Sequence, residues 1–83
     1  MHLTVKLYAG LGQYLPANAV KNKMEVDVPK DTTPNQILQR FNVPQELAHL
    51  VLVNGVFTLP KERNSKVLQQ DDVLAVWPPI AGG

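Results

Sequence analysis

The residues best suited to chemistry in this sequence stand in its last segment, VWPPIAGG, residues 76–83. Gly82 and Gly83 carry no Cβ, so they can pass through a narrow channel and leave the final carboxylate open to attack. Pro78 and Pro79 have no N–H to donate to a β-ladder, so they end the preceding apolar run and stiffen the base of the tail. We therefore expect an end that is inserted into a partner, with Gly83 as the reacting residue.

The sequence offers few other reactive groups. Cysteine is absent, which excludes disulfides, thiolate zinc sites and cysteine nucleophiles. His2 and His49 lie far apart in the sequence, and neither has a carboxylate at ligand spacing beside it, so we expect no metal site. If the protein handles sulfur, that sulfur is not held on a thiol of this chain.

Three further motifs are interpreted as loops and turns. The GLG at 10–12 begins a nucleotide-loop pattern, but the third glycine of that pattern would fall at Leu15, so the segment is interpreted as a turn. Asp71 and Asp72 are adjacent in a polar turn, where their carboxylates point apart and into water. The charged run KER at 61–63 is interpreted as a solvated loop face.

The composition indicates one globular domain. The 83 residues are 45% hydrophobic and 18% charged, which is ordinary for a folded chain with a single core. No apolar run is long enough to cross a membrane, and the N-terminus alternates apolar and polar residues instead of forming a signal peptide, so we expect a cytoplasmic protein without a membrane partner. The net charge of +1 comes without a basic tract, which argues against nucleic acid as a partner.

The first half of the sequence predicts two strands and a helix. Residues 2–8 and 23–28 alternate apolar and polar side chains, the period of strands covered on one face. Thr33 and Gln36 form a T-x-x-Q capping box, so a helix is expected to begin at the proline between them, Pro34. It should end near position 42, because the proline at 44 disfavours helical geometry at the residue before it.

The second half predicts a hairpin and a final strand. Residues 50–53 and 56–57 flank an Asn-Gly dipeptide, which tolerates the positive backbone angles of a two-residue hairpin. A brief apolar pair at 67–68 is interpreted as a minor strand. Residues 73–77 are continuously apolar, which is typical of a strand in the centre of a sheet.

One face of the predicted sheet should pack on the helix. The residues expected in this core are Ile37, Leu38 and Phe41 from the helix and Leu3, Val5, Leu7, Met24, Val26, Leu74 and Val76 from the strands. Alternation sends Val73, Ala75 and Trp77 to the other face, which a chain of this length cannot cover with a second layer. We expect an exposed apolar patch there, where Trp77 docks partners together with Phe57. The alternative is that Trp77 closes one end of the core.

The order of these elements and the ending PPIAGG resemble the ubiquitin-like β-grasp sulfur carriers of the MoaD/ThiS type. The likeness includes the T-x-x-Q helix, the V-N-G hairpin and an acidic turn before the last strand. The ending is similar to the PP-x-x-GG of molybdopterin synthase small subunits, and its double proline favours that branch over the thiazole-forming carriers. The resemblance implies an α+β β-grasp domain at 1–77, with a mixed sheet of four to five strands on one main helix, and a flexible tail at 78–83.

The resemblance also implies the chemistry of the tail. An adenylyltransferase of the ubiquitin-activating type would use ATP to adenylate the Gly83 carboxylate, and a sulfur donor would displace AMP to leave a thiocarboxylate. The tail would then enter the large subunit of molybdopterin synthase, which supplies the catalytic lysines. The chain itself would be a non-catalytic carrier subunit with no bound cofactor. Its partner-contacting residues would be Phe57, Trp77, Pro78, Pro79, Ile80 and Ala81, with Gly82 beside the reacting residue.

Two other functions are consistent with the same residues. The chain could carry sulfur for another pathway, such as thiamine, tungsten cofactor or amino-acid synthesis, or it could be a ubiquitin-like modifier joined to target lysines. A tail that merely happens to finish in two glycines is the structural alternative. The family often has Asp-Gly-Asp before the final strand, whereas this chain has Gln70-Asp71-Asp72, so a residue other than glycine must form that turn.

Overall fold

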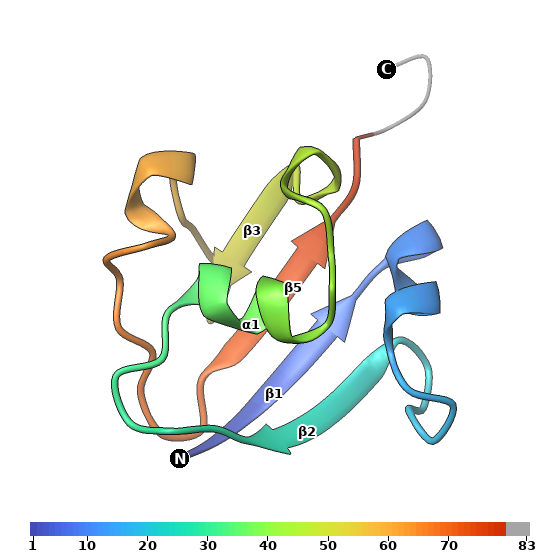
Figure 1. Cartoon of the computed structure of the whole chain (residues 1–83), viewed down its shortest axis with the longest axis horizontal. Coiled ribbons are helices and arrows are strands. Elements are labelled where there is room, and N and C mark those ends of the chain that lie inside the picture. Colours follow the sequence, from blue (N-terminus) through green and yellow to red (C-terminus); the bar gives the residue numbers. More distant parts are fainter. Residues whose placement is uncertain (80–83) are drawn as a thin grey trace.

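A computed structural model describes residues 1–79 as a five-stranded sheet with helix α1 across one face (Figure 1). The elements in chain order are β1 (His2–Leu7), η1 (Ala9–Tyr14), β2 (Lys23–Asp27), α1 (Pro34–Arg40), η2 (Gln45–Leu47), β3 (Leu50–Val53), β4 (Val56–Phe57), η3 (Pro60–Glu62) and β5 (Val73–Trp77). The predicted α+β class, with a mixed sheet packed on one main helix, is confirmed.

The last strand of the chain lies in the middle of the sheet. The strand order is β2-β1-β5-β3-β4, in which β1 and β5 are parallel and the other neighbours are antiparallel. In the register, Val5 lies beside Leu74 on one side of β5, and Val51 lies beside Val76 on the other. Strands pair with both edges of β5, and its three middle residues are buried, while Val73 and Trp77 at its ends are half-buried.

Helix α1 begins as the sequence predicts. The Thr33 hydroxyl accepts a hydrogen bond from the Gln36 N–H at 3.4 Å, and the Gln36 side chain accepts one from the Thr33 N–H at 2.9 Å. Pro34 takes the first helical position, where its missing N–H costs nothing. The helix ends at Arg40, slightly earlier than predicted, because Asn42 adopts a positive φ of 60° that an α-helix cannot contain.

The core lies between α1 and the sheet and contains nearly all the residues predicted for it. The completely buried members include Leu3, Val5, Leu7, Leu74 and Val76, while Ile37 and Leu38 of the helix are 1% exposed. Met24 is the exception, because β2 is an edge strand and this side chain only packs partly against the core. The core also takes in residues from loops, including Leu11 and Leu68.

The β3–β4 hairpin and the turn before β5 hold each other. Asn54 and Gly55 have φ values of 51° and 83°, the pair of positive angles expected for the predicted two-residue turn. The Asn54 side chain donates to the Asp72 carboxylate at 2.7 Å and accepts from the Val73 N–H at 2.8 Å. Asp71 has a φ of 67°, so it does take the left-handed conformation at the position where the family often has glycine.

Two loop predictions are wrong. Residues 9–14 form the 3-10 helix η1 instead of a simple turn, because this winding places Leu11 in the core. No strand forms at 67–68 among the described residues; Leu68 is a buried anchor whose N–H donates to the Thr32 carbonyl, and Val67 is 40% exposed. A lone buried side chain in an irregular segment gives the same short apolar signal as a strand. None of the helices within residues 1–79 has the length and apolar character needed to cross a membrane.

The interpretation of 61–63 as a solvated face is wrong for Arg63. This side chain is 3% exposed, and its guanidinium donates to the carbonyls of Ala48, His49 and Thr58 at 2.7, 3.2 and 3.4 Å. Burial lowers the pKa of the guanidinium from its ordinary value. Arg63 therefore donates hydrogen bonds to three loop carbonyl groups that are not paired within a sheet or a helix. Lys61 is exposed, as predicted.

We expect Arg63→Met to destabilise the fold by about 3 kcal/mol, because a buried carbonyl left without a donor costs about 1–3 kcal/mol. Lys61→Met is the matched control, and an exposed substitution of this kind should change the free energy of unfolding by less than about 0.5 kcal/mol. Urea denaturation of both variants measures the difference. Equal stability of the two would show that the Arg63 hydrogen bonds contribute nothing.

Candidate functional site: the tail root and the open face of the sheet

The base of the C-terminal tail is fixed by backbone hydrogen bonds at the end of β5. The Val76 carbonyl accepts from the Tyr8 N–H at 3.0 Å, and the Trp77 carbonyl accepts from the His49 N–H at 3.0 Å. Pro78 is half-buried and Pro79 is exposed. Because both prolines lack an N–H, the sheet cannot extend past Trp77 through them. The tail root, which we define as residues 77–79, therefore leaves the sheet from a constrained position.

The four residues beyond this root, Ile80, Ala81, Gly82 and Gly83, lie outside the described residues. The roles predicted for them, as the reacting end and as partner contacts, stay predictions.

The face of the sheet opposite α1 has no second layer among residues 1–79 (Figure 1). Leu74 and Val76 point to the helix and are completely buried, so Val73, Ala75 and Trp77 point to this open face. The prediction of an exposed patch is wrong at Ala75, because this residue is only 8% exposed. Its neighbours in the register are Lys6 and Leu52, whose longer side chains shield so small a residue.

Trp77 lies on the open face and does not close the core. Its ring stacks on Tyr8, with 4.3 Å between ring centroids and an angle of 6° between the planes. Leu50 of β3 is its partner across the register. Both aromatic side chains are half-buried, and neither belongs to the core cluster. The tail root is thus bordered by a flat aromatic pair.

Phe57 shares this face with Trp77. It pairs with Leu52, which pairs in turn with Ala75, so these residues follow one row across β4, β3 and β5. Phe57 is 46% exposed. We call the apolar side chains of this face the apolar ridge: Phe57, Leu52, Leu50, Trp77 and Tyr8. The two predicted aromatic anchors, Phe57 and Trp77, therefore lie on one continuous surface that ends at the tail root, where the predicted contacts Pro78 and Pro79 follow.

The other half of the open face is polar. His2 of β1 contacts Glu25 at 2.8 Å through Nε2 and Asp27 at 3.5 Å through Nδ1, both from β2. The pKa of His2 is raised from 6.5, chiefly by the hydrogen bond to Glu25. Desolvation opposes this rise in part, and Asp27 adds to it. No cluster of three or more ligating side chains within residues 1–79 is arranged to hold a metal ion. The open face thus divides into the apolar ridge and a polar half.

The model of the ThiS family matches residues 12–83 of this chain. The chain belongs to the ThiS family. The predicted resemblance to ubiquitin-like sulfur carriers of the MoaD/ThiS type is thereby confirmed. A comparison with curated proteins gives no match.

Solved structures share the fold over most of the chain. SAMP1 from Haloferax volcanii is 24% identical, with full coverage of both chains and a TM-score of 0.69. A putative molybdopterin converting factor subunit 1 from Pyrococcus furiosus is 17% identical, with 95% of this chain and 98% of that one covered and a TM-score of 0.65. A complex of subunits 1 and 2 of molybdopterin-converting factor from Helicobacter pylori contains a chain that is 16% identical, with full coverage of both chains and a TM-score of 0.59. The β-grasp fold expected of this chain is confirmed by these likenesses.

Sequence reasoning missed Tyr8 and the two leucines of the apolar ridge. The strand predicted at 2–8 includes Tyr8, but β1 ends at Leu7, and the ring of Tyr8 contacts Trp77, which is distant in the sequence. The available signal was the alternation of β3, in which Leu50 and Leu52 are half-buried while Val51 and Val53 are buried. An apolar run without polar positions conceals which residues face outward.

We expect Trp77→Ala to destabilise the fold less than Leu74→Ala, although tryptophan is the larger side chain. Loss of a completely buried leucine costs about 2–5 kcal/mol, whereas Trp77 is half-buried and its stacking contributes about 0.5–1.5 kcal/mol beyond area burial. Thermal and urea denaturation of both variants test this order. A Trp77→Ala protein as unstable as Leu74→Ala would place Trp77 in the core.

Proposed function

We propose that this ThiS-family chain carries sulfur on Gly83 as the small subunit of a molybdopterin synthase. An adenylyltransferase of the ubiquitin-activating type joins the Gly83 carboxylate to AMP and releases pyrophosphate from ATP. Hydrosulfide from a sulfur donor then attacks the acyl carbon, AMP leaves, and a thiocarboxylate results. The chain contributes the carboxylate and the docking surface, and it binds no cofactor of its own.

The observation that carries the proposal is the joint position of the tail root and the apolar ridge. Backbone bonds from Tyr8 and His49 fix the last carbonyls of β5, and the Trp77–Tyr8 stack lies directly beside them. A partner that binds the ridge therefore receives the tail from a defined starting point. The six residues 78–83 reach roughly 20 Å when extended at about 3.3 Å per residue, far enough to enter an active site.

Support for the molybdopterin branch comes from the double proline and from the solved relatives. The Helicobacter pylori neighbour is described as part of a complex of two subunits of molybdopterin-converting factor. By analogy, the large subunit of the synthase is the proposed acceptor, and its binding site would cover the apolar ridge. Transfer to a pterin precursor would take place inside that partner.

A protein modifier is the second candidate, and the likeness to SAMP1 favours it. A further solved neighbour, also from Haloferax volcanii and 24% identical, is described as small archaeal modifier protein 1. Modification would use the same adenylate, but a lysine amine of a target would displace AMP and form an isopeptide bond. Carriers for other pathways share the thiocarboxylate and differ only in the acceptor.

We expect removal of Gly83 to abolish sulfur loading without changing the melting temperature, because the buried core described above is formed by residues between Leu3 and Val76. Incubation with ATP, an activating enzyme and sulfide, followed by intact mass measurement, detects the replacement of one oxygen by sulfur. Gly82→Ala should give an intermediate result, since a methyl group obstructs a narrow channel but leaves the carboxylate intact. Gly10→Ala is the matched control, because a Cβ there meets no atom within 4 Å.

Loading of a chain that lacks Gly83 would refute the carrier proposal. An immunoblot of cell extract separates the two candidates: conjugates of higher mass that require Gly83 identify a modifier, and their absence together with thiocarboxylate identifies a carrier.

We expect Trp77→Ala to weaken binding to the activating enzyme and to the acceptor subunit by roughly thirtyfold, because loss of an aromatic anchor costs about 2 kcal/mol or more at an interface. Isothermal titration with each purified partner measures this effect. Val67→Ala is the control, because Val67 is also exposed but lies outside the apolar ridge. Unchanged affinity of Trp77→Ala would show that partners do not dock on the ridge.

A further inference from the structure

The outer edge of β2 presents backbone groups that lack a partner within residues 1–79. Backbone bonds join Asn22 to Leu7 of β1 and Val28 to Met1, the residue before β1. By alternation, the even-numbered positions of this antiparallel strand therefore face β1. Lys23, Glu25 and Asp27 therefore direct their N–H and C=O groups away from the sheet. Such an edge is able to pair with another extended chain.

Within residues 1–79, the backbone groups at both ends of this edge have hydrogen-bond partners, and those at its centre do not. The N–H and C=O of Lys23 pair with Val20 at 3.0 and 3.1 Å, and the Asp27 carbonyl accepts from Arg40 Nη1 at 3.1 Å. Three groups are left over: the N–H and C=O of Glu25 and the N–H of Asp27. The closed ends prevent long strand pairing of the kind that leads to aggregation, while the open centre has room for a short segment.

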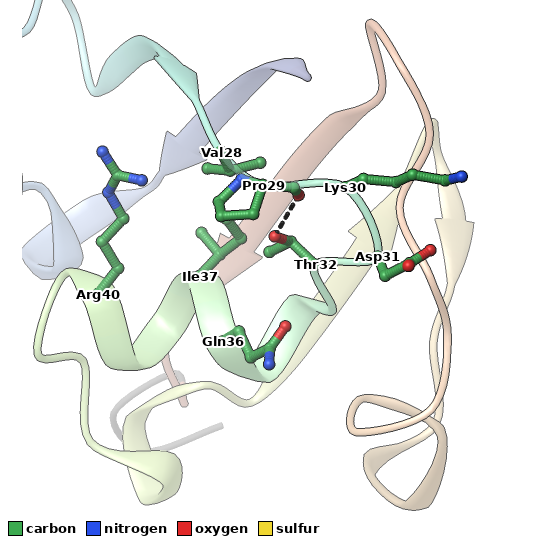
Figure 2. Close-up of a pocket in the computed structure, with 8 residues that line it drawn as sticks. All are labelled: Val28, Pro29, Lys30, Asp31, Thr32, Gln36, Ile37 and Arg40. Atoms are coloured by element: carbon green, nitrogen blue, oxygen red, sulfur yellow. Dashed lines mark hydrogen bonds between the residues drawn. The ribbon is translucent and has the colours of Figure 1, made fainter.

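A hollow lies beside this edge on the helix side. It has a volume of about 430 Å³ and is lined by the segment 28–32, which follows β2 in the chain, and by α1. Val28 and Ile37, both buried core residues, form its apolar floor. Figure 2 shows Arg40 at one end of the hollow and Lys30 and Asp31 at the other. The hollow is large enough for an apolar side chain from an added strand.

A second hollow adjoins the other end of β2. It has a volume of about 340 Å³ and is lined in part by Val20, Lys23 and Met24. Val20 is 66% exposed, and Met24 is only partly buried. The outer edge of β2 therefore has open backbone groups at its centre and a partly apolar hollow at each end, the arrangement that an extended peptide recognises when it adds to a sheet.

The charges around the first hollow favour an acidic ligand at one end. Arg40 uses one N–H for the Asp27 carbonyl, and the ion pairs found within residues 1–79 both involve His2 instead. The remaining guanidinium N–H groups can bind a carboxylate. The acidic side chains of β2 do not interfere, because Glu25 and Asp27 lie on the open face with His2.

We propose that the outer edge of β2 binds a short extended segment of a partner protein. The segment adds to the sheet as a sixth strand through Glu25 and Asp27. Its alternate apolar side chains enter the hollow over Val28 and Ile37, and a carboxylate at one end binds Arg40. This surface is separate from the tail root, since β1 lies between β2 and β5, so it can be occupied while the tail is inside another partner. The inference does not rest on the proposed sulfur transfer.

A synthetic peptide of alternating threonine and valine, amidated and ending in two aspartates, tests this proposal. Titration into the ¹⁵N-labelled full chain should shift the amide resonances of Glu25, Asp27, Val28 and Ile37 in a saturable way. Arg40→Glu should weaken binding by at least about tenfold, because it places like charges together. Lys66→Glu is the matched control for net charge, since Lys66 is exposed and lies in a different loop.

Two further peptides make the test specific. A peptide that ends in two lysines should bind Arg40→Glu better than it binds the natural chain. This reversal of preference would show that the charged end of the peptide contacts the side chain at position 40. A peptide methylated on its backbone nitrogens along one edge should bind much more weakly, because it cannot donate to Glu25. The ¹⁵N spectrum of Arg40→Glu without peptide confirms that the variant is folded.

Three results would overturn the proposal. The first is the absence of shifts at Glu25 and Asp27 at millimolar peptide, and the second is equal binding of the methylated peptide. The third is self-association through this edge, seen as concentration-dependent shifts at the same residues without peptide. Sulfur loading of Gly83 should be unchanged in Arg40→Glu, so failure of this inference is distinguishable from failure of the proposed function.

Discussion

The parallel pairing of β1 with β5 is the contact on which the rest of the structure depends. It joins residues 4–7 to residues 73–76, near the two ends of the chain, and it places the last strand in the centre of the sheet. Parallel neighbours require a long crossover connection, and here everything from β2 to the turn at Asp71 lies within that connection. Because closing so long a loop carries a large entropic cost, we expect this pairing to form late in folding.

The same pairing fixes Trp77, the first residue of the tail root. A terminal strand at a sheet edge frays easily, whereas β5 pairs with β1 on one side and β3 on the other. Its last two carbonyls accept bonds from Tyr8 and His49, so β5 is hydrogen-bonded up to its last residue, Trp77. The transition from central strand to tail therefore occurs within one residue, and its position is defined by where the prolines stand.

The two faces of the sheet differ because residues 1–79 contain one main helix. Helix α1 covers only one face and supplies Ile37 and Leu38 to the core. The other face is left half-buried, with the apolar ridge beside the tail root and charged side chains over β1 and β2. An uncovered apolar surface on a small domain costs solubility, and docking a partner is the usual reason for it. The outer edge of β2 offers a third kind of surface, made of backbone groups instead of side chains.

Polar side chains fix the irregular segments that the sheet does not organise. Arg63 binds three loop carbonyls from within the structure, and Asp72 joins the β3–β4 hairpin to the turn before β5. Arg63 and Asp72 both contact groups that are distant in the sequence or that lie in loops without a regular hydrophobic pattern. For Arg63 the physical reason is that a backbone carbonyl removed from water needs a hydrogen-bond partner, and a side chain supplies it where ladders do not. The Asp72 contact is instead a side-chain pair with Asn54 at the surface.

The sequence alone determined the local features of this protein, because they depend on neighbouring residues. The capping box at Thr33, the hairpin at Asn54 and the stop at Pro78 follow from backbone chemistry within a few residues. Tertiary structure decided which apolar residues are covered and which charged residue is buried. Arg63 has the same local signature as the exposed Lys61, and Tyr8 meets Trp77 only because β1 and β5 are neighbours. Such contacts depend on strand order, and strand order is settled by the packing of the whole chain, which no local pattern encodes.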